Sequence, residues 1–363
     1  MISGHHIEYI KHLYDMAFND AENKYIFAVQ KEYNLVEDTI EWHPANNIKF
    51  DHVDKDVNKS YLRKNISIFK KILRNKPDTI IMVNIMDLFP FMPSIIHALG
   101  IKTTFSGILY DIYLYKWKAS SLLHKVKYIF FYKILKMQKH IKRVWVLNDK
   151  ASCRVLNTRW KTDKFVFLPD PIPLDITSNS EDRMITRKEC TNFLHCGSMS
   201  ERKGTICLLD AIKLIDCDKG KRRYFFLGKV NLDIHDLFYK KTKDLSKDHD
   251  IIIQDGFCDF EVLKEHIKKS DYIVLPYKET AKSSGIIGYA ALFNKHVVVP
   301  RTGLIKRLVR SYMLGTTLEN VRPQTIANFI TNSTAIKHRV NGEAYVKNHR
   351  VIDFNNTINL ICH

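Results

Sequence analysis

Short apolar runs alternate with longer amphipathic stretches along the first half of the chain. The runs predict strands at 25–29, 79–84, 102–107, 144–147 and 165–171, and the stretches between them predict helices at 57–74, 93–99 and 148–156. Strands that alternate with helices are typical of a doubly wound parallel sheet. The first half therefore predicts an α/β domain.

The second half resumes this alternation after a break. Pro169, Pro171 and Pro173 stiffen the exit from the first half, and the polar run 177–189 after them predicts a linker. Beyond the linker an apolar run ends at Gly197, and from 251 to 300 the order is strand, helix, strand, loop, helix, strand. A second α/β domain is predicted, because 363 residues exceed what one hydrophobic core usually fills.

The loop after the apolar run at 193–196 has the features of a phosphate site. Gly197 allows the backbone to approach a ligand closely, and Gly204 opens the next helix. Arg202 and Lys203 bring positive charge to that helix N-terminus, where unpaired N–H groups already favour anions. A solvated basic loop is the alternative interpretation.

These landmarks, taken in order over about 144–300, resemble the C-terminal domain of GT-B glycosyltransferases, particularly the retaining family four. The resemblance implies an α/β fold of GT-B type, in which two Rossmann-like doubly wound domains face a cleft. Its expected parts are an acceptor-binding domain at 1–175, a linker at 176–190, a nucleotide-sugar-binding domain at 191–335, and a C-terminal helix at 336–363 that crosses back to the first domain.

The resemblance also implies roles for the basic loop. Lys203 matches the family's lysine for the donor pyrophosphate, whereas Ser198 occupies the position of its arginine, so Arg202 is expected to supply the missing charge. Gly197 and Ser198 are then expected to contact the donor. Gly256 and Phe257 match the family's glycine turn, and Phe257 is expected to flank the nucleobase beside the backbone of Gly256.

The sequence departs from the family where two glutamates are expected. Tyr289 or Ala290 falls at the second glutamate, which usually binds the ribose hydroxyls, and Ala281 or Lys282 falls at the first. Glu279 is close enough in the loop to substitute for the first. The missing carboxylates raise the question of whether activity is retained.

The segment 283–286 offers other groups at this position. Ser283, Ser284, Gly285 and Ile286 place hydroxyls and backbone N–H groups at a predicted helix N-terminus, which suits a phosphate or sugar hydroxyls. Simple helix capping by the serines is the alternative.

The N-terminus resembles the glycine loop and first helix that follow strand one of a GT-B domain. Gly4 and His5 are therefore expected in the cleft, and the first strand itself is apparently missing. A helix start that faces solvent is the alternative for the histidines His5 and His6. Ser106 and Asp111 are predicted to follow a strand end, where ligands bind in such sheets.

Charge is the second strong feature. Lys and Arg number 57 against 39 Asp and Glu, so an anionic partner is expected. The segment 116–143 interleaves lysines with aromatic residues, which predicts a helix that binds an anionic membrane surface. Packing of its apolar side on the sheet is one alternative. Nucleic-acid binding is a remote one, since no recognition motif for nucleic acid occurs.

The composition narrows the classes of protein to which the chain can belong. No run of about twenty apolar residues and no signal peptide is found, and the seven cysteines form no C-x-x-C pair, which favours reduced thiols in the cytoplasm. The prediction is a cytoplasmic, peripherally membrane-bound glycosyltransferase that uses a nucleotide-sugar, with no metal or other cofactor, and transfers to a lipid-linked glycan. A non-catalytic GT-B subunit and a sugar-nucleotide epimerase are alternatives.

Overall fold

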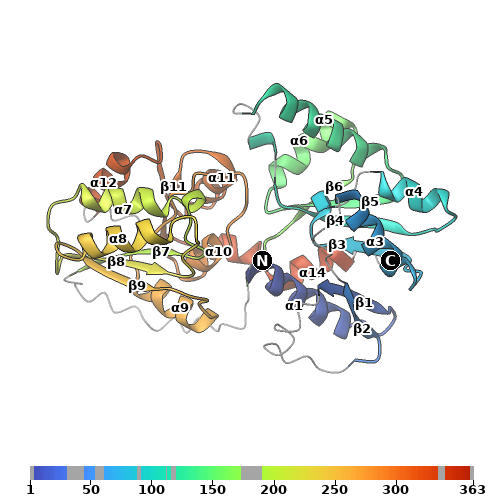
Figure 1. The fold of residues 1–363 in the computed structure, drawn as a ribbon, viewed down its shortest axis with the longest axis horizontal. Helices are drawn as coiled ribbons and strands as arrows, with labels where there is room; N and C mark the ends of the chain where they lie inside the picture. Colours follow the sequence, from blue (N-terminus) through green and yellow to red (C-terminus); the bar gives the residue numbers. More distant parts are fainter. Residues whose placement is uncertain are drawn as a thin grey trace. The chain divides into compact units, whose positions relative to one another are not determined.

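The computed structural model describes residues 4–30, 45–53, 61–87, 91–111, 113–115, 120–172, 190–333 and 340–359. The chain divides into two compact α/β units (Figure 1). Unit 1 comprises Met1–Tyr110, Ala119–Pro169 and Val351–His363, and unit 2 comprises Asp111–Lys118 and Asp170–Arg350. The α/β fold class predicted from the alternation is confirmed.

Unit 1 contains two parallel sheets. One pairs β1 (Tyr25–Gln30) with β2 (Ile48–Val53), and the other has the order β3 (Thr79–Met82), β4 (Thr104–Leu109), β5 (Ile141–Leu147), β6 (Phe165–Leu168). Among the described residues no strand pairs with both β1 and β3.

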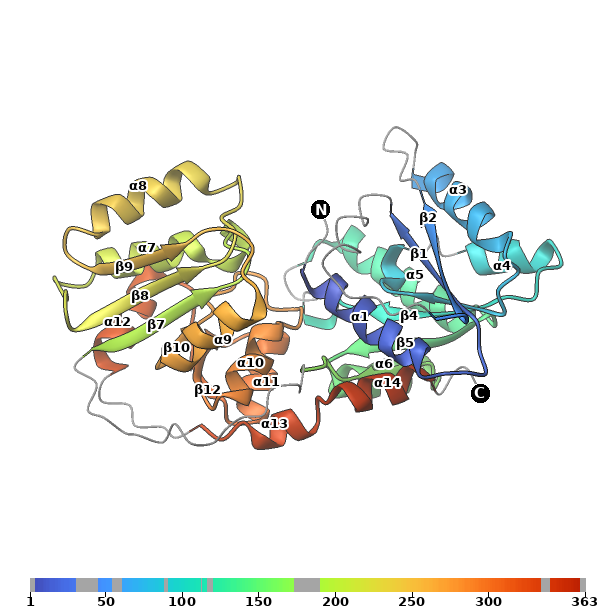
Figure 2. The same cartoon turned by 90° about the horizontal axis from the view of Figure 1, so that it is seen from below.

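The helices of unit 1 are α1 (Gly4–Phe18), α3 (Tyr61–Leu73), α4 (Met92–Ala98), α5 (Leu122–Met137), α6 (Lys150–Trp160) and α14 (Val351–Asn359). α1 and α14 lie side by side (Figure 2). Tyr9 of α1 stacks on Phe354 of α14 at 5.6 Å between ring centroids. Their shared core contacts both Phe27 of β1 and Ile81 of β3, so these two helices join the two sheets.

Unit 2 is built on one parallel sheet of six strands in the order β12-β11-β10-β7-β8-β9. The strands are β7 (Thr191–Cys196), β8 (Arg222–Leu227), β9 (Asp250–Gln254), β10 (Tyr272–Val274), β11 (His296–Pro300) and β12 (Gly315–Leu318). Because the chain turns back at β10 beside β7, the order reverses between these two strands. Ligands bind at such a reversal in open α/β sheets, just beyond the carboxyl ends of the strands.

The helices of unit 2 are α7 (Thr205–Lys213), α8 (His235–Leu245), α9 (Phe260–Lys269), α10 (Gly285–Leu292), α11 (Gly303–Ser311), α12 (Pro323–Asn332) and α13 (Glu343–Lys347). α7, α8 and α12 share one buried cluster, while α9 lies on the opposite face of the sheet (Figure 1). Six cysteines lie in the described residues and are free thiols. Burial raises the pKa of Cys153 and of Cys196 to about 12, so these two thiols act as core side chains.

The C-terminal helix predicted from the sequence is interrupted. It forms α13 and α14, and between them Arg350 pairs with Ile172, whose N–H donates to the His349 carbonyl at 2.9 Å. α13 belongs to unit 2 and α14 to unit 1, because the boundary between the units follows Arg350. The expectation of a single continuous helix was therefore wrong, because the chain turns at Asn348 and Arg350 pairs with another segment before α14 begins.

Two further local predictions were wrong. Gly4 and His5 do not form a loop, since α1 begins at Gly4 and its buried side chains, among them Leu13 and Ala17, extend one amphipathic pattern. Ser106 does not follow a strand end, because β4 continues to Leu109 and the buried Ile108 and Leu109 belong to it.

Candidate functional site

The loop after β7 has a tightly determined backbone. Gly197 ends the strand with a φ of 99°, and Ser200 caps the short helix η4 (Glu201–Lys203) by accepting the Lys203 N–H at 3.3 Å. Gly204 follows with a φ of 71° and opens α7. Left-handed backbone favours glycine at both ends of the loop, as the sequence indicated.

Gly204 also lies directly against the loop that follows β10. A Cβ atom at this position would stand 1.9 Å from the Pro276 carbonyl oxygen, so a larger residue cannot be accommodated without moving the backbone. Lys278 strengthens the contact, because its N–H donates to the Arg202 carbonyl at 3.0 Å and its ammonium pairs with the Glu201 carboxylate. The basic loop and the loop after β10 are therefore joined.

His195 supports this arrangement from inside the sheet, although sequence reasoning did not single it out. Its Nδ1 donates to the Val274 carbonyl at 2.9 Å, so its Nε2 accepts from the Thr205 hydroxyl at 2.9 Å. Thr205 in turn accepts the Ser200 N–H at 3.2 Å. Burial lowers the pKa of His195 to about 4, and a neutral ring suits both hydrogen bonds.

Lys203 contacts an aromatic ring that is hydrogen-bonded to the residue before the predicted phosphate-binding helix. Its Nζ lies 3.6 Å from the centre of the Tyr277 ring, and the Tyr277 hydroxyl is hydrogen-bonded to the Ser284 hydroxyl at 3.2 Å. Tyr277 and Ser284 are both buried. The structure thus brings together Lys203 and Ser284, which are eighty-one positions apart in the sequence.

The start of α10 presents backbone N–H groups rather than capping serines. Ser284 precedes the helix, but its hydroxyl makes no capping hydrogen bond. Ser283 donates its hydroxyl proton to the Asp170 carboxylate at 2.6 Å. Gly285 and Ile286 are the first helical residues, and the first N–H groups of a helix have no partner within it. Such a helix end attracts anions.

A third loop adds an exposed aromatic ring. Gly256 follows β9 with a φ of 131°, and Phe257 is 85% exposed. Asp255 fixes the loop by accepting the Val230 N–H at 2.8 Å and the Tyr239 hydroxyl at 2.8 Å. Burial acts to raise the pKa of Asp255, but these hydrogen bonds outweigh it and the pKa lies below its ordinary value. Asp255 was not singled out from the sequence.

The turn at Gly197 contacts the end of the next strand. A Cβ on Gly228 would stand 2.3 Å from the Gly197 carbonyl oxygen. Ser198 is exposed and donates its hydroxyl proton to the Asn231 side chain at 2.9 Å. The ends of β7 and β8 are therefore held as closely as those of β7 and β10.

The structure places no carboxylate at the positions of the two family glutamates. Tyr289 and Ala290 are buried inside α10, and the Tyr289 ring lies 5.3 Å from that of Phe260. Glu279 is exposed in the loop between β10 and α10, and Arg202 is exposed in η4. Their predicted roles stay predictions.

The predicted residues of the N-terminal half belong to different parts of the fold. Ser106 is fully buried inside β4 and accepts the Arg143 N–H at 3.2 Å, so its hydroxyl serves the sheet. Asp111 does follow the end of β4, two residues after Leu109. Gly4 and His5 form the first turn of α1.

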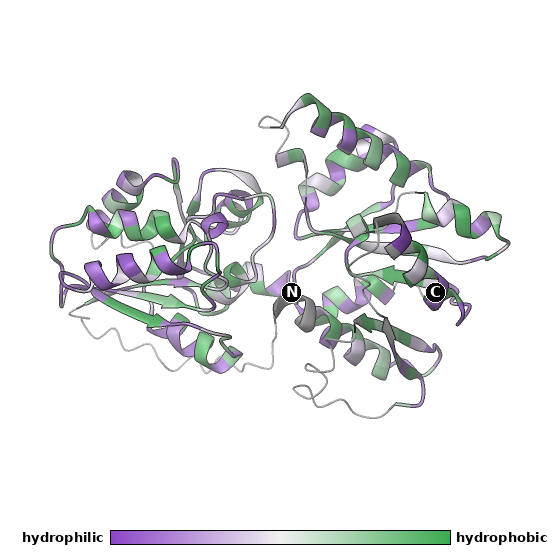
Figure 3. Ribbon diagram, in the orientation of Figure 1, coloured by the Kyte–Doolittle hydropathy of each residue, from purple (hydrophilic) through white to green (hydrophobic). Residues whose placement is uncertain are grey.

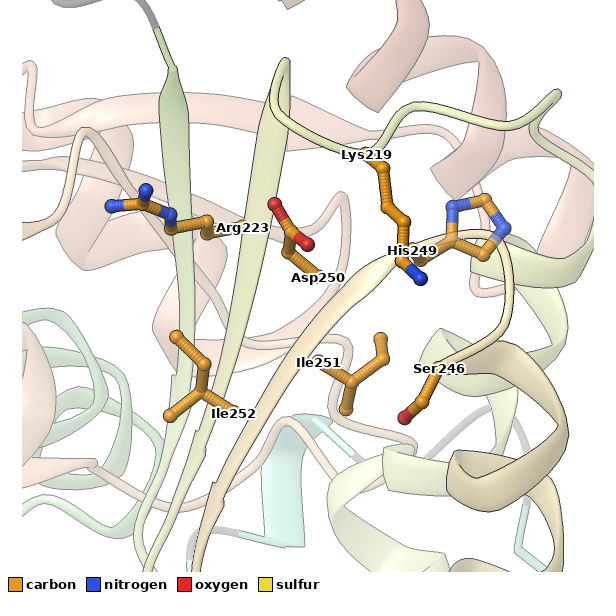
Figure 4. Close-up of a pocket in the computed structure, with 7 residues that line it drawn as sticks. All are labelled: Lys219, Arg223, Ser246, His249, Asp250, Ile251 and Ile252. Carbon is orange, nitrogen blue, oxygen red and sulfur yellow. The ribbon is translucent and has the colours of Figure 1, made fainter.

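A separate hollow lies at the amino ends of β8 and β9, and its labelled side chains are shown in Figure 4. Arg223 is the second residue of β8 and Asp250 is the first residue of β9, so this hollow is at the opposite end of the strands from Gly197 and Gly256. Across the described ranges, no three His, Cys, Asp or Glu side chains are grouped as metal ligands would be.

Comparison with solved structures identifies the fold. Anabaena HepE in complex with UDP and glucose has a TM-score of 0.68 and 14% identity over 97% of this chain and 95% of that one. WaaG, a glycosyltransferase involved in lipopolysaccharide biosynthesis, has a TM-score of 0.61 and 13% identity over 92% and 98%. The chain has the GT-B fold.

A third GT-B structure is equally well covered. The α,α-trehalose-phosphate synthase from Burkholderia xenovorans has a TM-score of 0.65 and 9% identity over 93% of this chain and 99% of that one. No protein-family model and no curated protein matches the sequence. In this GT-B chain, the carboxyl ends of β7, β8, β9 and β10 carry the glycines, the lysine and the helix N-terminus described above.

Proposed function

We propose that this chain is a glycosyltransferase that moves a hexose-type unit from a nucleotide-sugar to a glycan. The observation that carries the proposal is the convergence of Lys203, Tyr277 and the N-terminus of α10. A cation beside a helix N-terminus suits a diphosphate. The HepE complexes, which contain UDP and UDP-glucose, support a nucleotide-sugar as the donor.

In this proposal the protein acts mainly on the leaving group. Negative charge develops on the diphosphate as the bond to the sugar breaks, and in this proposal Lys203, Arg202 and the α10 N-terminus neutralise it. Removing one such electrostatic partner typically costs about 10²–10³ in rate. Phe257 flanks the nucleobase beside the Gly256 backbone, and Glu279 supplies a carboxylate near the sugar. Retention of configuration follows from the family resemblance.

The acceptor side is proposed on different grounds. We infer a lipid-linked glycan at the cytoplasmic face of a membrane, with Asp111 as a polar contact. The likeness in fold to WaaG and the basic helix α5 support this inference. No metal ion is proposed for the transfer, because the lysine and the helix N-terminus supply positive charge at the leaving group.

A non-catalytic GT-B subunit is the second candidate. The observation in its favour is that Tyr289 and Ala290, where the family has its ribose-binding glutamate, are buried and carry no carboxylate. Such a subunit would bind a nucleotide-sugar without turnover. An epimerase would convert the sugar-nucleotide itself, and it is distinguished by the identity of the product.

Donor binding tests the proposal first. Thermal shift and saturation-transfer NMR with UDP-, GDP-, ADP- and CMP-sugars are expected to select one nucleotide class. Lys203→Ala is expected to weaken that binding by about 10–100-fold, since a charge-assisted contact to phosphate is lost. Lys213→Ala is the matched control, because Lys213 is an exposed lysine at the far end of α7.

Three outcomes separate the candidates. Turnover of the selected donor with release of the nucleotide supports the glycosyltransferase. Binding without turnover, over a range of acceptors, favours the non-catalytic subunit. Equal donor affinity in the Lys203→Ala and Lys213→Ala variants would remove the basic loop from the donor site and contradict the proposal.

A further inference from the structure

One surface of unit 1 combines exposed apolar side chains with lysines and is not used by the donor site. The apolar side chains, from 43% exposed at Phe91 to 82% exposed at Leu123, are those of Phe91, Ile95, Leu99, Leu122, Leu123, Val126, Phe130 and Met137. We call these eight side chains the α4–α5 surface. Large apolar side chains gathered in this way mark interaction sites.

Three contacts show that α4 runs alongside the second half of α5 and the residues that directly follow it. The rings of Phe91 and Phe130 are 6.3 Å apart at one end. In the middle, Ser94 donates to the side chain of Gln138 at 2.5 Å. At the other end His97 stacks on His140 at 3.9 Å. The apolar side chains of the two helices are therefore parts of one surface.

The exposed residues of α4 and α5 follow the helical repeat. Phe91, Ile95 and Leu99 follow one another at intervals of four residues, and so do Leu122, Val126 and Phe130 along α5. The other side of α5 is buried, because Phe131 and Tyr132 pack inward and Tyr132 contacts the ring of Phe165. The sequence alone did not show which of the aromatic residues of 116–143 face outward, nor that α4 contributes.

Lysines accompany the apolar side chains on α5. Lys127, Lys133 and Lys136 of α5 are exposed, as is Lys139 just after it, and Figure 3 shows hydrophilic and hydrophobic residues alternating along this helix. Between 88 and 148 the chain carries ten Lys or Arg and a single acidic residue, Asp111. A surface with this charge is complementary to an anionic partner and repels a second copy of itself.

We infer that the α4–α5 surface docks on an anionic lipid bilayer, with α5 lying in the plane of the interface. α5 has 16 residues and is about 24 Å long, and none of the helices found in the described residues is long and apolar enough to span a membrane. A short helix with apolar and basic side chains exposed together binds at the headgroup level. The leucines at the start of α5 enter the acyl boundary, and the lysines meet the headgroups.

This inference deepens the proposed function and rests on it for the lipid-linked acceptor, but its test does not use the donor. The full chain is incubated with vesicles of phosphatidylcholine alone and with vesicles that contain 30 mol% phosphatidylglycerol, and bound protein is separated by flotation. Binding is expected to the anionic vesicles, and it is expected to weaken as salt is raised because the lysines are screened.

Two double variants test the two parts of the surface. Lys133→Gln with Lys136→Gln is expected to lower the partition coefficient on anionic vesicles by about 30-fold, since each lysine near such a surface contributes a factor of about five. Ile95→Ser with Leu123→Ser is expected to lower it by at least tenfold. The matched control is Leu232→Ser, because Leu232 is 92% exposed in unit 2.

Other occupants have distinct signatures. Equal binding to neutral and anionic vesicles, or no loss in either double variant, would overturn the inference. A concentration-dependent dimer lost in the Ile95→Ser, Leu123→Ser variant would assign the surface to a second copy, and binding of single-stranded oligonucleotides with no vesicle binding would assign it to nucleic acid. Donor binding is expected to be unchanged in every variant. Failure of the docking test therefore leaves the proposed function standing, and failure of the donor-binding test leaves the docking inference standing.

Discussion

The two units use the same alternation of strands and helices, yet their sheets are held in different ways. In unit 2 six strands are continuous, and backbone contacts at Gly204 and Gly228 fix the loops at the carboxyl ends of the strands. In unit 1 the strands form two sheets, and the side chains of α1 and α14 join them. A site that needs fixed N–H groups is therefore better served by unit 2.

The stability of unit 1 is expected to depend more strongly on a single side chain than that of unit 2. Phe354→Ala removes a fully buried ring that stacks on Tyr9 in the cluster joining both sheets. Its free energy of unfolding is expected to fall by about 3–5 kcal/mol. Denaturant unfolding followed together with donor binding measures this, and donor affinity is expected to stay unchanged below the transition.

The control for this variant lies on the same helix. Ile352 is 53% exposed, so Ile352→Ala is expected to change stability by less than about 0.5 kcal/mol. A loss of donor affinity in folded Phe354→Ala protein would contradict this prediction, because it would show that donor binding depends on the core of unit 1.

The stability of unit 2 is expected to depend most strongly on a close backbone contact at a glycine. Gly204→Ala combines a left-handed φ with a Cβ placed 1.9 Å from Pro276 oxygen, and it is expected to cost about 2–4 kcal/mol and most of the donor affinity. Gly220→Ala separates the two causes, because Gly220 has a φ of 75° and nothing within 4 Å of the added Cβ. It should cost only about 1 kcal/mol. Similar losses in both variants would refute the role of the Pro276 contact.

A smaller effect is expected from pH. Burial lowers the pKa of His195 to about 4, so the unfolded chain takes up a proton at this residue before the folded one does. The stability contributed by the neutral ring is present above about pH 6.5 and is lost as the pH falls towards 4, by up to about 3 kcal/mol. Unfolding measured from pH 7 to pH 4 should show this loss.

The pH effect is assigned by comparison with two variants. His195→Asn is expected to be less stable than the wild type at pH 7, with a difference that narrows as the pH falls. His235→Asn alters an exposed ring and should leave the profile unchanged. A wild-type profile identical in slope to that of His195→Asn would contradict the buried neutral ring.

The sequence predicted the parts of the fold in which local pattern and packing agree. The strands that became β3, β5 and β11 were recognised because their apolar runs are flanked by proline, glycine or polar residues. The extent of β4 was missed, since the glycine after Ser106 suggested a turn although the strand continues. Likewise, nothing in 344–360 marked the point at which Arg350 pairs with Ile172.

The candidate site was predicted only where its residues have local signals. Gly197, Lys203 and Gly204 stand together in a recognisable loop. His195 is hydrogen-bonded to Val274 and Thr205, and Asp255 to Val230, and no local sequence pattern connects these partners. The outward face of α5 was not predictable for a similar reason. Tyr132 is buried because β6 supplies Phe165 beside it, and that contact exists only in the folded unit.

The position of α14 has a consequence for biosynthesis. Unit 2 is nearly one uninterrupted stretch, Asp170–Arg350, whereas unit 1 is completed by Val351–His363 after it. On the ribosome, the second unit can therefore fold as soon as it emerges, while the first must wait for α14 to cover its two sheets. The N-terminal half then matures after unit 2, and the aromatic pair Tyr9–Phe354 joins α1 to a helix that is translated more than 300 residues later.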